Sequence, residues 1–207
     1  MNLTYKKGKG DKIHISVDGE YFITVDEMYF SSLYLKNGQN IDSDELLQLK
    51  SDIDARRAFN YAVSLLSKRA HSEHEILIKF RQKGITEGIE QAIEKLKRFG
   101  YIDDERFASL YVSELINIKK YGKRRIEQEL YRKGIDRDII KDVIEHAEFP
   151  EERLHELIRR KYIRYLNDEK GVSKTVNALV RLGYSYSEIR EALSEINDEL
   201  NLEVSDE

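Results

Sequence analysis

The chain has 207 residues, of which 36% are charged and 40% apolar, with one proline and neither cysteine nor tryptophan. The lack of cysteine excludes a disulfide scaffold, a thiolate metal site and a cysteine nucleophile, and it fits the reducing cytoplasm. No stretch approaches the roughly 20 apolar residues of a membrane span, and no signal-like apolar run follows the polar N-terminus. We therefore expect a soluble cytoplasmic protein with no membrane partner.

The formal net charge of −4 conceals two regions of opposite charge. Seven cations and two anions lie between Lys119 and Lys133, whereas eight anions and one cation lie between Glu188 and Glu207. Since local clusters decide what a surface attracts, the net charge says little about partners.

The N-terminal segment favours a small β-hairpin followed by helices. Apolar and polar residues alternate over residues 12–17, and a β-branched and aromatic run follows Asp18-Gly19. An Asp-Gly pair accepts the positive φ angles of a type I′ turn, which predicts a hairpin. A short helix is expected over residues 26–35, and a further helix should open at residue 43 or 44.

From residue 53 onward the apolar residues follow helical spacing, and the pattern repeats at an offset of 50 residues. Lys83-Gly84-Ile85 recurs as Lys133-Gly134-Ile135, and Leu65 matches Leu115. A weaker third copy reaches Gly183 after a one-residue deletion. Each copy reads as a long helix, a short helix ending at the glycine, and a third helix. Glycine at that point suits a left-handed helix C-terminus.

Further signals mark the helix boundaries and complete the fold prediction. Ser72 with Glu75, and Ser185 with Glu188, have capping-box spacing, and the single proline precedes two glutamates, as at a helix start. We predict a mainly α fold with three tandem three-helix repeats in an elongated curved array, preceded by a small β-hairpin and helix appendage. The expected boundaries are 1–52 for the appendage and 53–104, 105–149 and 150–207 for the repeats, the last with an acidic end.

The sequence contains no recognisable catalytic motif. It contains no phosphate-binding glycine loop, dinucleotide fingerprint, nucleophile elbow or zincin helix. His71 and His74 have no third ligand nearby, so we interpret them as solvated residues of a capping turn rather than a metal site. Asp103-Asp104-Glu105 is interpreted as a helix cap. We expect neither enzymatic activity nor a cofactor or metal.

Cations and tyrosines gather at corresponding joints of successive repeats. Cations that neutralise phosphates beside rings that stack on bases are typical of a single-strand binding surface. Tyr162 and Tyr165 also match core positions of the other repeats, and we interpret them mainly as core. The first turn at Lys123, Arg124 and Arg125 is expected to face solvent. The predicted binding residues, expected to form a continuous basic face, are Lys68, Arg69, Lys119, Lys120, Lys123, Arg124, Arg125, Arg132, Lys133, Arg159, Arg160 and Arg164.

Several spaced motifs carry a family resemblance over about residues 53–200. In the second repeat they are the run Tyr101-Ile102-Asp103-Asp104-Glu105-Arg106-Phe107-Ala108, followed by Gly122, Arg125, Ile126, Glu129, Leu130, Lys133, Gly134 and Ile135. In the first repeat they are Arg69, Ser72, Glu75, Lys79, Lys83 and Gly84, with Ile76 and Phe80 where leucines are more usual. This pattern resembles the RecX family, regulators of the RecA recombinase.

The resemblance implies a monomeric regulator that lodges in the groove of the RecA–single-stranded DNA filament and touches both RecA and DNA. It implies inhibition of filament growth, ATPase activity and strand exchange, and thereby modulation of recombinational DNA repair and the SOS response. The acidic stretch from Glu188 to Glu207 would repel nucleic acid, so we expect it to face solvent or a basic patch on the filament.

Two alternatives stay open at the level of sequence. Three-helix units can imitate helix-turn-helix modules, which would give a sequence-specific regulator bound to double-stranded DNA. The candidate recognition helix at residues 72–82 lacks an evident set of base-reading side chains. The other alternative is a helical scaffold that binds only protein.

Overall fold

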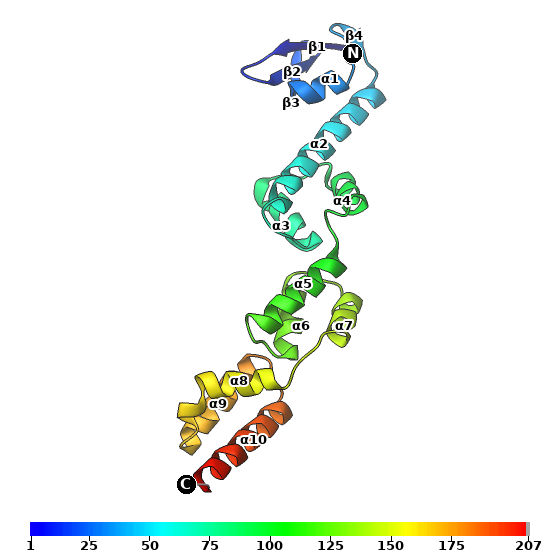
Figure 1. Cartoon of the computed structure of the whole chain (residues 1–207). Helices are drawn as coiled ribbons and strands as arrows, with labels where there is room; N and C mark the ends of the chain where they lie inside the picture. Colours follow the sequence, from blue (N-terminus) through cyan, green and yellow to red (C-terminus); the bar gives the residue numbers. More distant parts are fainter. Residues whose placement is uncertain (206–207) are drawn as a thin grey trace. The chain divides into compact units, whose positions relative to one another are not determined.

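The computed structural model describes residues 1–205, and the side chains of residues 1–198. A small sheet is followed by a series of helices (Figure 1). The strands are β1 (Asn2–Lys7), β2 (Lys12–Val17), β3 (Glu20–Asp26) and β4 (Gln39–Asn40). The helices are α1 (Glu27–Ser32), α2 (Ser43–Leu66), α3 (Glu73–Lys83), α4 (Ile89–Arg98), α5 (Asp104–Asn117), α6 (Lys123–Arg132), α7 (Arg137–Glu145), α8 (Glu152–Lys161), the 3₁₀ turn η1 (Ile163–Tyr165), α9 (Glu169–Arg181) and α10 (Tyr186–Ser205).

The chain divides into two compact units. The first contains residues 1–68 and 79–101, and the second contains residues 69–78 together with the chain from residue 102 onward. The sheet, α2 and α4 therefore belong to the first unit. The first turns of α3 belong to the second unit, with α5 and the helices that follow it.

The N-terminal sheet is antiparallel with strand order β3-β2-β1-β4. Asp18 and Gly19 have φ angles of 49° and 85°, which confirms the predicted hairpin turn between β2 and β3. Strands β1 and β4 were not predicted, and the sheet is larger than the expected hairpin. In β1 only Leu3 is fully buried, and two lysines end the strand, so its sequence gives a weak strand signal.

Helix α2 contributes to two hydrophobic cores. It continues without a break across residue 52, where the sequence predicted the end of the appendage. Its N-terminal half buries Leu49 and Ile53 in the core beneath the sheet. Its C-terminal half buries Ala58 and Ala62 and packs beside α4 (Figure 1). Gly88, at the start of α4, has a φ of 68°, and a Cβ there would overlap the α2 backbone. A glycine is therefore required where the two helices approach most closely.

The helices of the second unit form two successive three-helix bundles, as predicted. Helices α5, α6 and α7 enclose a core that includes Leu115 and Leu130, and α8, α9 and α10 enclose another that includes Ile158 and Leu179 (Figure 1). The first helix of the last bundle is shorter than expected. It ends at Lys161, where three cations in its last turn complement the helix dipole, and η1 follows.

Within the second unit, the second helices of successive repeats meet end to end. Gly122 N–H at the start of α6 donates to the carbonyl of Leu182 at the end of α9, at 2.8 Å. At the equivalent place one repeat earlier, the Ser72 hydroxyl at the start of α3 donates to the carbonyl of Lys133, at 2.6 Å. Unpaired carbonyls at one helix end thus meet donors at the start of another helix, an arrangement that also aligns their dipoles. We call each of these contacts a helix-end joint.

Both helix-end joints depend on a glycine without a side chain. Gly134 and Gly183 have φ angles of 73° and 95°, which confirms the predicted left-handed C-termini. A Cβ would overlap the His74 side chain at Gly134 and the Arg125 backbone at Gly183. Gly84, the equivalent residue of the first repeat, has a φ of 72°, but a Cβ added there would meet no atom within 4 Å.

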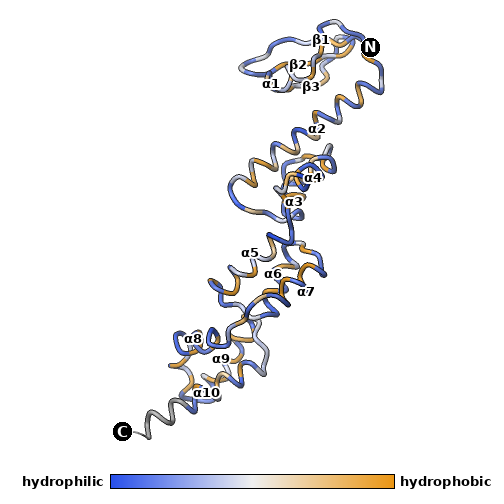
Figure 2. Tube along the Cα trace, turned by 45° about the vertical axis from the view of Figure 1, so that its right-hand side comes forward, coloured by the Kyte–Doolittle hydropathy of each residue, from blue (hydrophilic) through white to orange (hydrophobic). Residues whose placement is uncertain are grey.

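The helices are amphipathic along their length. Figure 2 shows apolar residues recurring at intervals rather than in long uninterrupted runs. In the described part of the chain, no helix combines the length and apolarity that crossing a bilayer requires. The apolar stripes are instead taken up by the cores described above.

Alanine substitution should separate the two reasons for a glycine at these positions, the left-handed backbone and the lack of space for a Cβ. Gly84→Ala should lower the free energy of unfolding by about 1–2 kcal/mol, since only the left-handed backbone penalises it. Gly183→Ala should cost on the order of 1–3 kcal/mol more, because its Cβ also collides with the α6 backbone. Urea denaturation followed by circular dichroism measures the loss of unfolding free energy in both variants. Equal losses would contradict the requirement for a glycine at the helix-end joint.

Candidate nucleic-acid interface

Three cations, Lys123, Arg124 and Arg125, occupy the first turn of α6 without an acid among them. Every other α-helix described has an acidic residue in its first turn. Cations at a helix N-terminus oppose the helix dipole and are unfavourable there by a few tenths of a kcal/mol each, to about 1 kcal/mol. The stability of α6 by itself therefore does not explain this turn. The carbonyl end of α9, which meets the start of α6, offsets part of the cost, and an anionic partner would also relieve it.

The loop before α6 is held in place by the third repeat. Lys120 has a left-handed φ of 57°, uncommon for a residue with a side chain. Its carbonyl accepts a hydrogen bond from the Tyr184 hydroxyl at 3.0 Å. Tyr184 is buried, and burial raises the pKa of its phenol. We call Lys119, Lys120, Lys123 and Arg124 the α6 basic turn; Lys120 is half-buried and the other three are exposed.

Side chains, rather than backbone amides, would contact an anion at the α6 basic turn. The amides of Gly122 and Arg124 already donate to the carbonyls of Leu182 and Gly183, at 2.8 and 3.3 Å. Two of the first donors of α6 are thereby satisfied within the chain. The exposed ammonium and guanidinium groups remain available.

Arg125 is only partly exposed, so the expectation that it faces solvent as Lys123 and Arg124 do is wrong. Its side chain is 30% exposed and lies 2.7 Å from the carboxylate of Glu129, one turn along α6. Its guanidinium also lies 5.6 Å from the centre of the Tyr121 ring. The backbone of Arg125 lies so close to Gly183 that a Cβ there would overlap it. This arginine therefore belongs to the helix-end joint, and its charge is already neutralised.

Arg69 and Lys133 are likewise engaged by a carboxylate. Lys133 Nζ lies 2.8 Å from Glu75 Oε1, and Arg69 donates to both Glu75 oxygens at 3.2 Å. Burial by itself would raise the pKa of Glu75, but the hydrogen bonds and charges of Arg69 and Lys133 outweigh it and lower the pKa to about 2. We call these three residues the Glu75 ion cluster. It ties the start of α3 to the end of α6.

A second exposed basic surface lies where α8 ends. A hollow of ≈ 440 Å³ is lined by Arg160, Lys161, Tyr162, Ile163, Arg164 and Tyr165, which we call the α8 basic hollow. Arg164 lies over the Tyr165 ring at 4.8 Å. Tyr162 is half-buried against the core, but Tyr165 is 47% exposed, so its interpretation as core is wrong. The 3₁₀ turn carries Tyr165 away from the helical register that the other repeats follow.

The remaining predicted cations are exposed. Lys68 lies at the end of α2 in the first unit, and Arg159 lies in the last turn of α8. Arg132 is 60% exposed and pairs with Glu129 at 3.0 Å. Lys161 was not among the predicted residues, although it continues the Arg159-Arg160 run and lines the α8 basic hollow.

One arginine outside the predicted set is buried. Arg153 in α8 is 7% exposed and lies 5.5 and 5.7 Å from the ring centres of Phe149 and Tyr184. Its Nη1 donates to the carbonyl of Ile116 at 3.4 Å. Arg153 thus packs the second and third repeats together and cannot contact a partner's phosphates.

The histidines and acids near α3 and α5 have structural roles. His71 is buried rather than solvated, contrary to expectation; its Nδ1 donates to the Arg69 carbonyl at 2.9 Å, and burial lowers its pKa. Asp103 accepts from the Arg106 amide, which confirms the predicted cap of α5. Among the described residues, no group of three potential ligands is placed to hold a metal ion.

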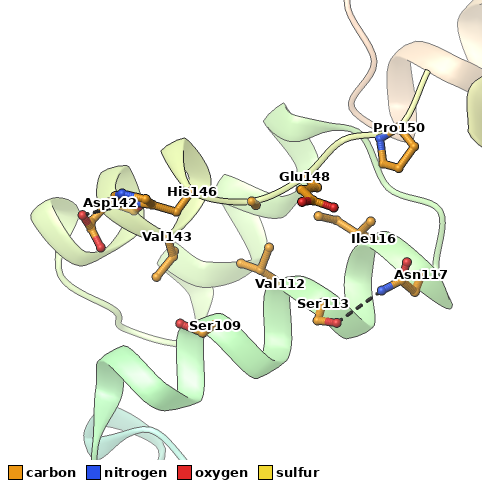
Figure 3. A pocket seen from close by; sticks show the side chains of 11 residues that line it. Ser109, Val112, Ser113, Ile116, Asn117, Asp142, Val143, His146, Glu148 and Pro150 are labelled. Carbon is orange, nitrogen blue, oxygen red and sulfur yellow. Dashed lines mark hydrogen bonds and ion pairs between the residues drawn. The ribbon is translucent and has the colours of Figure 1, made fainter.

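A further hollow of ≈ 400 Å³ lies between α5 and α7, and its chemistry does not suit phosphate (Figure 3). Its floor includes Val112, Ile116 and Val143, and no lysine or arginine lines it. At its rim, His146 donates to the Asp142 carbonyl and lies 3.4 Å from the Asp142 carboxylate; both contacts raise the pKa of His146. The basic surfaces are therefore separate from this hollow.

The acidic C-terminal stretch faces solvent as far as its side chains are described. Glu188, Glu191, Glu195 and Asp198 are all exposed. Glu195 lies 3.0 Å from His155 of α8. The acids from Glu199 to Glu207 lie outside the described side chains.

Comparison with protein families gives matches to two consecutive domains. Residues 58–96 match the model described as "RecX, first three-helix domain", and residues 103–144 match "RecX, second three-helix domain". The regulatory protein RecX of Caldanaerobacter subterraneus subsp. tengcongensis is 32% identical over 190 residues, covering 91% of this chain and 95% of that protein. The regulatory protein RecX of Clostridium acetobutylicum is 32% identical over 205 residues and 95% of each chain.

Two solved structures share the fold. A crystal structure of regulatory protein RecX has a TM-score of 0.69 at 24% identity and covers 93% of this chain and 97% of its own. The crystal structure of RecX from Lactobacillus salivarius has a TM-score of 0.63 at 28% identity, over 70% of this chain and 97% of its own.

Replacing Glu75 by glutamine should show how much the Glu75 ion cluster stabilises the fold, because this stabilisation depends on pH. Because the folded-state pKa is lowered from 4.5 to about 2, the stabilisation is complete above about pH 4.5 and is lost as pH falls towards 2. Above pH 5 the wild type should exceed the Glu75→Gln variant by on the order of 3 kcal/mol in free energy of unfolding, and the gap should close in acid. Urea titrations at several pH values measure the gap. A gap that does not change with pH, or the same pH dependence in the exposed-site control Glu156→Gln, would contradict a stabilising role of the Glu75 ion cluster.

Proposed function

Because the chain belongs to the RecX family of regulatory proteins, we propose that it binds the RecA filament on single-stranded DNA and restrains it. Binding in the filament groove would inhibit filament growth, RecA ATPase activity and strand exchange, and would thereby modulate recombinational repair and the SOS response. The proposal requires contacts to phosphates and to RecA, and it assigns no chemical step to this chain.

The observation that carries the proposal is the α6 basic turn. Its cations oppose the dipole of α6. Among the described residues, Lys119, Lys123 and Arg124 have no carboxylate within ion-pair distance, whereas Arg125 has one. The Tyr184 hydrogen bond fixes the loop before a ligand arrives. A preformed cationic turn loses little conformational freedom on binding, so more of the phosphate attraction contributes to affinity.

The α8 basic hollow offers a second contact within the same unit. Its three cations suit phosphates, and the exposed Tyr165 ring suits a base or a RecA side chain. By contrast, Arg69, Arg125 and Lys133 would remain with their carboxylates. In this proposal they shape the interface and do not touch the DNA backbone.

The exposed acids of α10 would lie away from nucleic acid, since their charge repels phosphates. They suit solvent or a basic surface of the filament. The three-helix repeats then act as a support that displays cations from some turns and acids from others.

Charge reversal at the α6 basic turn tests the proposed function. The triple variant Lys119→Glu, Lys123→Glu, Arg124→Glu should lose binding to RecA-coated single strands and should no longer inhibit RecA ATPase. Each lost phosphate contact should flatten the slope of log affinity against log salt by about 0.7. The measurements are fluorescence anisotropy at several salt concentrations and ATPase turnover at substoichiometric amounts of this protein.

The matched control reverses Lys6, Lys9 and Lys36, three exposed lysines of the N-terminal region, and alters net charge equally. That variant should keep inhibition. Full inhibition and an unchanged slope in the α6 variant would overturn the assignment of this turn. Tight binding to one duplex sequence without RecA would instead favour a double-stranded DNA regulator, and indifference to nucleic acid would favour a protein scaffold.

A further inference from the structure

A cluster of three aromatic rings lies at the surface of the first unit. Phe59 comes from α2, and Phe99 and Tyr101 follow the end of α4. Each pair of ring centres is 6.3 Å apart, and the rings are inclined by 65–71° in edge-to-face contact. Phe99 and Tyr101 are nevertheless 55% and 52% exposed. We call these three residues the aromatic cluster.

Two cations border the aromatic cluster. Lys95 Nζ lies 4.8 Å from the centre of the Phe59 ring and 6.0 Å from that of Phe99. The Arg98 guanidinium lies 5.5 Å from the centre of Phe99. Among the described side chains, neither cation has a carboxylate within ion-pair distance. Their charges are therefore directed at the rings and at solvent.

Core packing does not explain this arrangement. Phe99 and Tyr101 leave about half of their surface in water, and large exposed rings gathered in one place commonly mark an interaction surface. Their mutual contacts restrain the rings, so a planar ligand would meet surfaces that are already ordered. Exposed planar groups with unpaired cations beside them combine the two features that single-strand binding surfaces use.

We propose that the aromatic cluster is a base-stacking site for single-stranded nucleic acid, with Lys95 and Arg98 contacting the neighbouring phosphates. A protein partner would cover the rings but would need its own acids to match both cations, whereas a nucleic-acid strand supplies planar bases and phosphates together. The site rests on the proposed function in that the chain acts on single strands. It adds direct base contact from the first repeat, formed without RecA.

The lack of tryptophan allows a specific optical test. Phe99→Trp would place the only tryptophan of the chain in the aromatic cluster. Oligo(dT), added without RecA, should quench its fluorescence through stacking. An abasic oligonucleotide of equal length retains the phosphates but offers no bases, and it should quench much less. Tyr34→Trp supplies a matched reporter in the same unit, 88% exposed and outside the cluster, and it should respond to neither oligonucleotide.

Affinity provides an independent measurement. The double variant Phe99→Ala, Tyr101→Ala should weaken binding of single strands by roughly tenfold for each stacked base lost, whereas Tyr101→Phe keeps a ring and should bind as the parent does. Circular dichroism melts identify any loss caused by unfolding. If the double variant is unfolded, the Phe99→Trp quenching result decides.

The outcomes distinguish this site from the proposed function. Equal quenching by abasic and normal strands, or quenching by RecA alone, would overturn base stacking; the latter would indicate a protein-docking surface. If RecA inhibition still depends on the α6 basic turn in that case, the proposed function stands and only the stacking site fails.

Discussion

The end-to-end contact between second helices is the constraint on which the second unit depends. A short helix leaves carbonyls unpaired at one end and amides at the other, and burying either end without partners is costly. Here the carbonyls of Lys133 and Leu182 accept from the starts of α3 and α6. Each contact satisfies two helix ends at once. It requires a glycine beside the carbonyl, because a side chain would fill the space that the neighbouring helix occupies.

The helix-end joints also sort the cations of the basic regions into two groups. At the first joint Lys133 pairs with Glu75, whereas at the equivalent positions of the second joint stand Leu182 and Arg125. The backbone contact recurs although the charges differ, so the ion pair is an addition to the joint and not its basis. Arg125 and Lys133 at the joints pair with nearby acids, whereas Lys123 and Arg124, beside Arg125, are exposed. Exposure, and not positive charge alone, defines the candidate interface.

Local signals could be predicted from the sequence, and long-range placements could not. Asp18-Gly19, the capping boxes at Ser72 and Ser185, and the left-handed glycines each act within a few residues, and the structure confirms them. The Arg125–Glu129 pair was also readable from its spacing of four residues. The Glu75–Lys133 pair joins residues 58 positions apart, and Tyr165 leaves the core because α8 ends early. Neither follows from periodicity, since one depends on how repeats dock and the other on where a helix stops.

The two proposed modes of contact differ in their response to salt, and this difference has a structural origin. Cations at the α6 basic turn act on phosphates through released counterions, so their contribution falls steeply as ionic strength rises. Rings of the aromatic cluster act through contact with base faces, which added salt affects far less. A chain that carries both would be attracted to nucleic acid over a distance by its cations and retained at short range by its rings. The cations would then govern how fast complexes form, and the rings would govern how slowly they dissociate.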